Sequence, residues 1–167
     1  VLINTAGFLQ TQAEATGQES TSQVSDRLQV VSQSGSFNSN SDQIESVQFV
    51  LAQSPGANNI DLSETSVELI GTDGQETFTL SQGFDSDGTD INIFTGSGVV
   101  LTETSDRAEV TLNLDDTSAG IDYTIGDNGY TLEEDDSLTV TFTTASGATT
   151  TTELRVPSTV VKDSVRL

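Results

Sequence analysis

The spacing of apolar residues changes near residue 34, and this change divides the sequence into two parts. In the first part, apolar and small residues follow one another at steps of three and four, the spacing of one face of an α-helix. This stripe comprises Leu2, Ala6, Leu9, Ala13, Thr16 or Gly17, Ser20, Val24, Leu28 and Val31. The spacing predicts an N-terminal helix over residues 1–34.

Such a helix would be longer than the rest of the chain can cover. At 1.5 Å per residue it would extend about 50 Å, so part of it should project from the protein or pack on another chain. One interpretation docks the helix on its own domain. The other packs it against copies of itself, because small residues such as Ala6, Gly7 and Gly17 allow close helix approach. A rod with a globular head can then repeat into a helical filament.

The second part of the sequence alternates between apolar and polar residues. It follows a polar stretch over residues 35–42, which we interpret as a linker. The alternating runs are Val47/Phe49/Leu51, Val67/Leu69, Phe78/Leu80, Ile91/Ile93, Val110/Leu112/Leu114, Leu138/Val140/Phe142 and Leu154/Val156. Turn pairs separate them, for example Asp73-Gly74 and Ser146-Gly147. The pattern predicts an antiparallel β-sandwich over residues 43–167, and with the helix an α+β fold.

Charge narrows the range of functions. The chain has 26 acidic and five basic residues, a formal net charge of -21, and no His or Cys. The absence of His and Cys excludes Ser-His-Asp and Cys-His catalysis, imidazole or thiolate zinc sites, and disulfides. The acidity argues against a nucleic-acid partner, because that binding depends on Lys and Arg. It suits a protein that works in concentrated salt, where repulsion between like charges is screened.

Two groups of charged residues carry candidate chemistry. Asp85, Asp87 and Asp90 surround Gly88 as in a calcium loop, but Phe94 stands where the bidentate Glu of such a loop belongs. We interpret the segment as an acidic surface turn and keep these carboxylates only as weak metal candidates. We predict no cofactor and no catalytic residue.

The triplet Ser-Asp-Arg occurs twice, at residues 25–27 and 105–107. Arg27 and Arg107 are expected to form ion pairs within the subunit. The alternative is that they meet acidic residues of a neighbouring subunit.

Several segments in order along the chain together resemble one family. They are the decapeptide VLINTAGFLQ at residues 1–10, VSDRL at 24–28, Pro55-Gly56 followed by Ile60-Asp61-Leu62, Ser105-Asp106-Arg107, and Arg155-Val156-Pro157 before the terminal Leu167. In these segments the chain resembles the archaellins, the archaeal flagellins, and its acidity resembles the halophilic branch. The most hydrophobic part of the family's helix is absent, and with no initiator Met we expect further sequence upstream.

The resemblance implies an extracellular, type IV pilin-like filament subunit. Its N-terminal helices would form the filament core, with Leu2, Ala6, Leu9 and Ala13 inside it, and an immunoglobulin-like sandwich would form the outer surface. Implied partners are further copies or paralogous archaellins, together with the archaellum motor and assembly machinery. A membrane would be involved only before assembly, through the missing N-terminal segment. The alternatives are an adhesive type IV pilin and a surface-layer binding module whose helix is a stalk.

Overall fold

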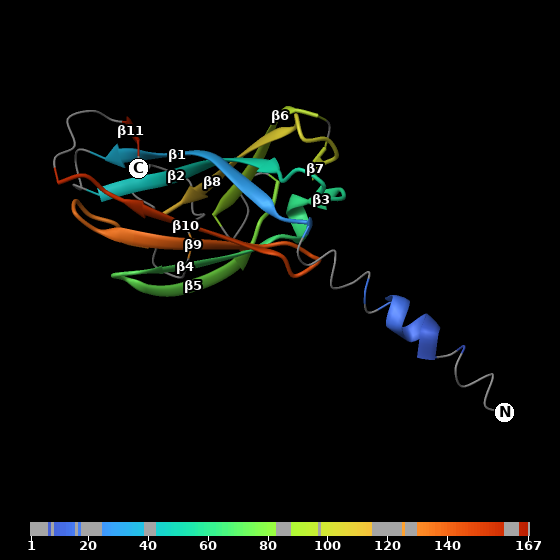
Figure 1. The fold of residues 1–167 in the computed structure, drawn as a ribbon. Coiled ribbons are helices and arrows are strands. Elements are labelled where there is room, and N and C mark those ends of the chain that lie inside the picture. Colours follow the sequence, from blue (N-terminus) through green and yellow to red (C-terminus); the bar gives the residue numbers. More distant parts are fainter. Residues whose placement is uncertain are drawn as a thin grey trace.

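The computed structural model describes residues 7, 9–15, 17, 25–38, 43–82, 88–96, 98–114, 125, 130–158 and 164–166, the last three by their backbone alone. Most of these residues belong to two antiparallel β-sheets that stack as a sandwich (Figure 1). In the described residues, no helix is both long and apolar enough to span a membrane.

Each sheet is built entirely from antiparallel neighbours. The five-stranded sheet has the order β11 (Ser164–Arg166), β1 (Leu28–Asn38), β2 (Gln43–Gln53), β8 (Arg107–Asn113) and β6 (Thr89–Thr95). The four-stranded sheet has the order β10 (Thr149–Arg155), β9 (Ser137–Thr143), β4 (Ser66–Gly71) and β5 (Gly74–Thr79). A short pair, β3 (Ile60–Asp61) and β7 (Val100–Leu101), and the 3-10 helix η1 (Leu62–Glu64) complete the described elements of the sandwich.

The core lies between the two sheets and is filled by the alternating apolar residues of the strands. Val47, Phe49 and Leu51 of β2 are fully buried, and so are Val140 and Phe142 of β9. The rings of Phe49 and Phe142 meet edge to face, with centroids 5.4 Å apart and planes at 79°. Because β2 and β9 belong to different sheets, this contact joins the two layers. The predicted antiparallel strands are therefore confirmed.

The long N-terminal helix, and with it the predicted α+β fold, is wrong. In the described part of the N-terminal region, helical backbone is confined to Gly7, residues 9–15, Gly17 and Ser25, and the protein is mostly β-strand. Residues 28–38 form strand β1, so the end of the predicted helix and the beginning of the predicted linker belong to the five-stranded sheet.

A β-bulge explains why this strand resembled a helix in sequence. The register of β1 against β2 shifts between Val30 and Ser32, so Val31 is the extra residue. Before the bulge the inward side chains, Leu28 and Val30, are even-numbered; after it the buried positions, Gly35 and Phe37, are odd-numbered. The bulge therefore interrupts the period of two, and Leu28 and Val31 fall by chance at the helical spacing of three.

Salt should stabilise this fold. The carboxylates greatly outnumber the cations, so their mutual repulsion opposes the compact state unless ions screen it. At about 1 M salt the screening length is about 3 Å, and it grows as salt is diluted. We expect dilution below about 0.5 M NaCl to lower the midpoint of thermal unfolding. Circular dichroism melts across a NaCl series measure this, and a midpoint independent of salt would contradict it.

Candidate functional site

Asp26 lies just before the first strand of the sandwich and is buried although it carries a carboxylate. Asp26 follows the helical residue Ser25 and lies two residues before β1. Its side chain is 8% exposed, and Oδ1 accepts hydrogen bonds from the backbone N–H of Asn58 at 2.8 Å and from Asn58 Nδ2 at 3.0 Å. Its carbonyl oxygen accepts a bond of 3.0 Å from Thr144 Oγ1. Asp26 thus fixes the start of β1 to two loops that are distant in sequence.

Gln53 holds the loop that carries Asn58. The residue is 3% exposed, and its Nε2 donates to the carbonyl oxygens of Ala57, at 2.9 Å, and of Asn58. The N–H of Ser54 donates to the carbonyl of Arg27 at 3.0 Å, which ties the same loop to the junction. A buried amide that bonds to two successive carbonyls allows the loop little freedom. We call Asp26, Gln53, Asn58 and Thr144 the junction cluster.

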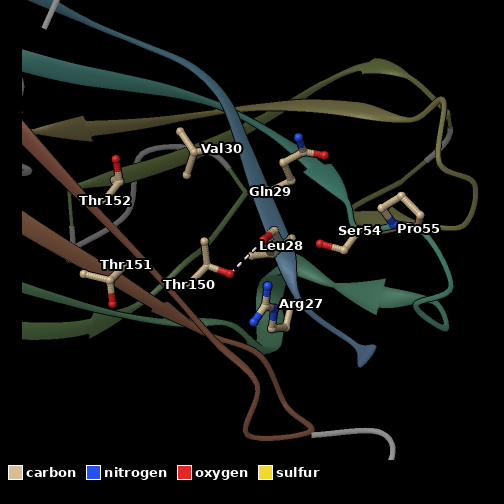
Figure 2. Close-up of a pocket in the computed structure, with 9 residues that line it drawn as sticks. All are labelled: Arg27, Leu28, Gln29, Val30, Ser54, Pro55, Thr150, Thr151 and Thr152. Atoms are coloured by element: carbon tan, nitrogen blue, oxygen red, sulfur yellow. Dashed lines mark hydrogen bonds between the residues drawn. The ribbon is translucent and has the colours of Figure 1, made fainter. Parts of the chain in front are cut away.

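A groove opens beside the junction cluster, between β1 and β10 (Figure 2). Its lining residues are Arg27, Leu28, Gln29, Val30, Ser54, Pro55, Thr150, Thr151 and Thr152. Thr150 Oγ1 donates to the carbonyl of Leu28 at 2.7 Å, and Thr152 Oγ1 donates to Gln33 Oε1 at 2.9 Å. These bonds join the two sheets directly, because β1 and β10 belong to different sheets. The floor of the groove is therefore a fixed part of the sandwich.

The two Ser-Asp-Arg triplets use Asp in the same way but Arg differently. Asp106 is buried like Asp26, and its Oδ2 accepts bonds from the N–H groups of Thr102, at 2.8 Å, and Glu103, at 3.0 Å. Arg107 Nη1 donates to the carbonyls of Thr104, at 2.8 Å, and Asp106, at 2.7 Å. The Arg27 side chain, in contrast, makes no hydrogen bond or ion pair with another residue in the described ranges. The predicted ion pairs within the subunit stay a prediction.

The pKa of Asp106 lies below the usual range of Asp. The largest cause is the hydrogen bond from the N–H of Thr102, followed by that from Glu103; the Thr102 hydroxyl and the Arg107 charge act in the same direction, against desolvation. The folded state therefore holds the ionised form, and the unfolded state binds more protons as the pH falls below about 4. This stabilisation is complete above that pH and is lost as the pH falls through the folded pKa.

Replacement of Asp106 by Asn should remove this pH dependence. We expect wild type to be more stable than Asp106→Asn at neutral pH, and the difference to shrink as the pH falls from about 4. Comparing the two proteins at each pH cancels the repulsion that all other carboxylates contribute. Urea unfolding at pH 7, 4 and 3 measures the difference, and a constant value across this series would contradict the expectation.

The helical residues of the N-terminal region lie outside the sandwich. All the described ones between Gly7 and Gly17 are exposed, and Leu9 is 59% exposed. Figure 1 shows this helix pointing away from both sheets. Of the predicted helix-packing residues, Leu9 and Ala13 lie on this exposed segment, and Leu2, Ala6 and Val24 lie outside the described residues.

The remaining predicted residues lie elsewhere. Leu28 is buried in the sandwich core, and Val31 is 50% exposed at the bulge of β1. Asp90 lies on β6, opposite Thr111 of β8, whereas Asp85 and Asp87 lie outside the described residues. Among the residues that the structure describes, no three acidic side chains are grouped so that they could hold a metal ion.

Most of the junction cluster has no signal in the sequence. Only Asp26 carried a signal, through the repeated Ser-Asp-Arg triplet. Thr144 lies 118 residues from Asp26 and Asn58 lies 32 residues from it, and no spacing rule connects positions so far apart. The Pro55-Gly56 pair indicates a turn in the sequence, but it does not predict the hydrogen bonds of this loop to Asp26 and Gln53.

Comparison with known proteins decides the family. Residues 1–154 match the family model described as archaeal-type flagellin. The chain belongs to this family. Flagellin B1 of Natrialba magadii is 49% identical over all of this chain and 84% of its own length, and Flagellin B3 of Halobacterium salinarum is 35% identical over all of this chain and 82% of its own. Both relatives come from haloarchaea, in agreement with the acidity of this archaellin.

A solved structure supports the same fold. The archaeal flagellum of Methanospirillum hungatei aligns with a TM-score of 0.67 over 99% of this chain and 87% of its own, at 16% identity. At this identity the likeness concerns the fold alone. The solved structure therefore supports the arrangement of a helical N-terminal segment and a β-sandwich in one chain. The family itself is shown by the family model.

Proposed function

We propose that this archaellin is a repeating subunit of the archaellum, an extracellular helical filament that propels swimming cells. The observation that carries the proposal is the family match over residues 1–154, together with 49% identity to a haloarchaeal flagellin. The family is structural, and we assign this chain a mechanical role without a catalytic step.

The described helix supports assembly through the N-terminal region. Leu9 and Ala13 are four residues apart, so they lie on one face of this helix, and both are exposed in the isolated chain. This helix points away from both sheets (Figure 1), so the free energy falls when another apolar surface covers its exposed Leu9. We propose that helices of other subunits provide that surface, with Leu2 and Ala6 continuing the same face.

The sandwich then forms the outer layer of the filament. Its own core is complete, since the residues between the two sheets are buried without any help from a second chain. Its acidic surface suits concentrated salt, where charge keeps the filament hydrated and repulsion between copies is screened. Other archaellins are the proposed co-subunits, and the membrane motor and the assembly machinery are the proposed further partners.

Charge at Leu9 should prevent assembly. In Leu9→Glu a carboxylate would have to be buried between helices, so we expect filaments per cell to fall about tenfold or more. The sandwich should melt as in wild type, because Leu9 is exposed and lies outside the hydrophobic core. Leu9→Ile is the matched control, since it keeps the apolar volume. Electron microscopy of cells counts the filaments, and wild-type numbers for Leu9→Glu would contradict helix packing at this position.

Swimming distinguishes the archaellum from an adhesive pilus. A strain without this chain should lose swimming in soft agar while it still attaches to surfaces. Loss of attachment with normal swimming would instead identify the chain as an adhesive pilin.

A further inference from the structure

Arg27 is an exposed cation in a chain that is rich in carboxylates. The net charge is -21, yet the Arg27 side chain is exposed and forms no ion pair with another residue in the parts that the structure describes. Arg107, in the second copy of the same triplet, donates two hydrogen bonds to nearby carbonyls. The exposed Arg27 guanidinium can therefore meet a carboxylate from outside, and guanidinium binds carboxylates well through paired hydrogen bonds.

The surroundings of Arg27 form a shaped site. Arg27 lies at the start of β1, at the groove between β1 and β10, with Ser54 and Pro55 on the neighbouring loop (Figure 2). The exposed Gln29 lies on the same groove and adds an amide. The hydrogen bonds of Thr150 and of the junction cluster fix both sides of the groove, so little order has to be gained on binding.

A matching acidic element lies at the opposite end of the sandwich. Glu133, Glu134 and Asp135 are exposed and precede β9, whereas Thr144, which bonds to Asp26, follows the other end of the same strand. Asp136 closes this turn by accepting a hydrogen bond from the N–H of Glu133 at 3.0 Å. The length of β9 therefore separates the acidic turn from Arg27, and the two cannot meet within one subunit.

We propose that the groove at Arg27 receives the acidic turn Glu133–Asp136 of a second copy of this chain. The inference depends on the proposed function, because it assigns a contact between neighbouring sandwiches in the filament. A contact between opposite ends is heterologous, so it leaves one groove and one turn free after each addition and can repeat without limit. In concentrated salt the repulsion between whole subunits is screened within a few ångströms, whereas an ion pair that the contact buries is screened much less.

Disulfide trapping tests this contact, since the chain contains no cysteine of its own. Filaments carrying both Arg27→Cys and Glu134→Cys should, after mild oxidation, give a ladder of covalent multimers on non-reducing gels. The matched control is Arg107→Cys with Glu134→Cys, which should give none. Intact double-cysteine filaments that yield only monomers would overturn the inference, and equal ladders from both pairs would do so as well.

Charge exchange decides the outcome if the double-cysteine chain makes no filaments. Arg27→Glu alone should reduce the number of filaments, and adding Glu134→Arg should restore it. No restoration would overturn the inference. Failure of the proposed function gives a different result from failure of this contact. If the chain is not a filament subunit, cells that produce the unaltered chain carry no filaments containing it.

Discussion

Replacing Phe142 by Ala should lower the free energy of unfolding by about 3–5 kcal/mol. Phe142 is fully buried, and it is the only part of β9 that stacks on an aromatic ring of the other sheet in the described region. The substitution loses the apolar burial, leaves a cavity and removes the edge-to-face contact with Phe49. Since domains of this size are stable by about 5–15 kcal/mol, a large part of the total stability would be lost.

Urea unfolding in concentrated salt measures this change. Thr139→Ala is the matched control, because Thr139 is an outward-facing residue of the same strand and its substitution should change stability by no more than about 0.5 kcal/mol. A loss below about 1 kcal/mol for Phe142→Ala would mean that the two sheets do not share the core described above.

Replacing Asp26 by Ala should lower the free energy of unfolding by about 1–3 kcal/mol and also reduce filament assembly. The substitution removes the hydrogen bonds that the N–H and Nδ2 of Asn58 donate to the buried Asp26 carboxylate. It also releases the constraint that the junction cluster places on residues 25–27, the described residues directly before β1, and so on the direction in which the chain leaves the sandwich toward the N-terminal helix. If the helix can adopt many orientations relative to the sandwich, it loses more conformational entropy when it packs into a filament.

Asp26→Asn is the matched control for this position. The Asn side chain keeps an oxygen that can accept from the N–H of Asn58, so its loss of stability should be smaller. Chemical unfolding and filament counts by electron microscopy are measured on both variants. If Asp26→Ala matches wild type in both measurements, the junction cluster does not fix the helix.

The sequence predicted the strands because each one faces a core on one side and water on the other. Val47/Phe49/Leu51 and Leu138/Val140/Phe142 alternate without interruption, and every one of these residues is buried. Strand β1 was missed because its bulge at Val31 shifts the parity of the inward positions. If one extra residue is allowed at Val31, the inward positions Leu28 and Val30 continue in the same alternating pattern as Gly35 and Phe37.

The candidate site was less accessible to sequence reasoning than the fold. Exposure of Leu9 agrees with an external partner for the helix face, but the face was expected to continue through Leu28, which instead packs in the sandwich. The junction cluster depends on side-chain hydrogen bonds between segments that only the fold brings together. The sequence does not distinguish Arg27 from Arg107, because both occur in the same triplet. Only the structure shows that Arg107 donates hydrogen bonds to nearby carbonyls.

Immunogold electron microscopy of intact cells tests the central claim most directly. An antibody raised against residues 43–167 recognises the sandwich, which should form the outer surface of the filament. We expect gold particles along thin helical filaments that extend from the cell. Gold spread evenly over the cell envelope, with filaments unlabelled, would contradict the assignment of this archaellin as a filament subunit.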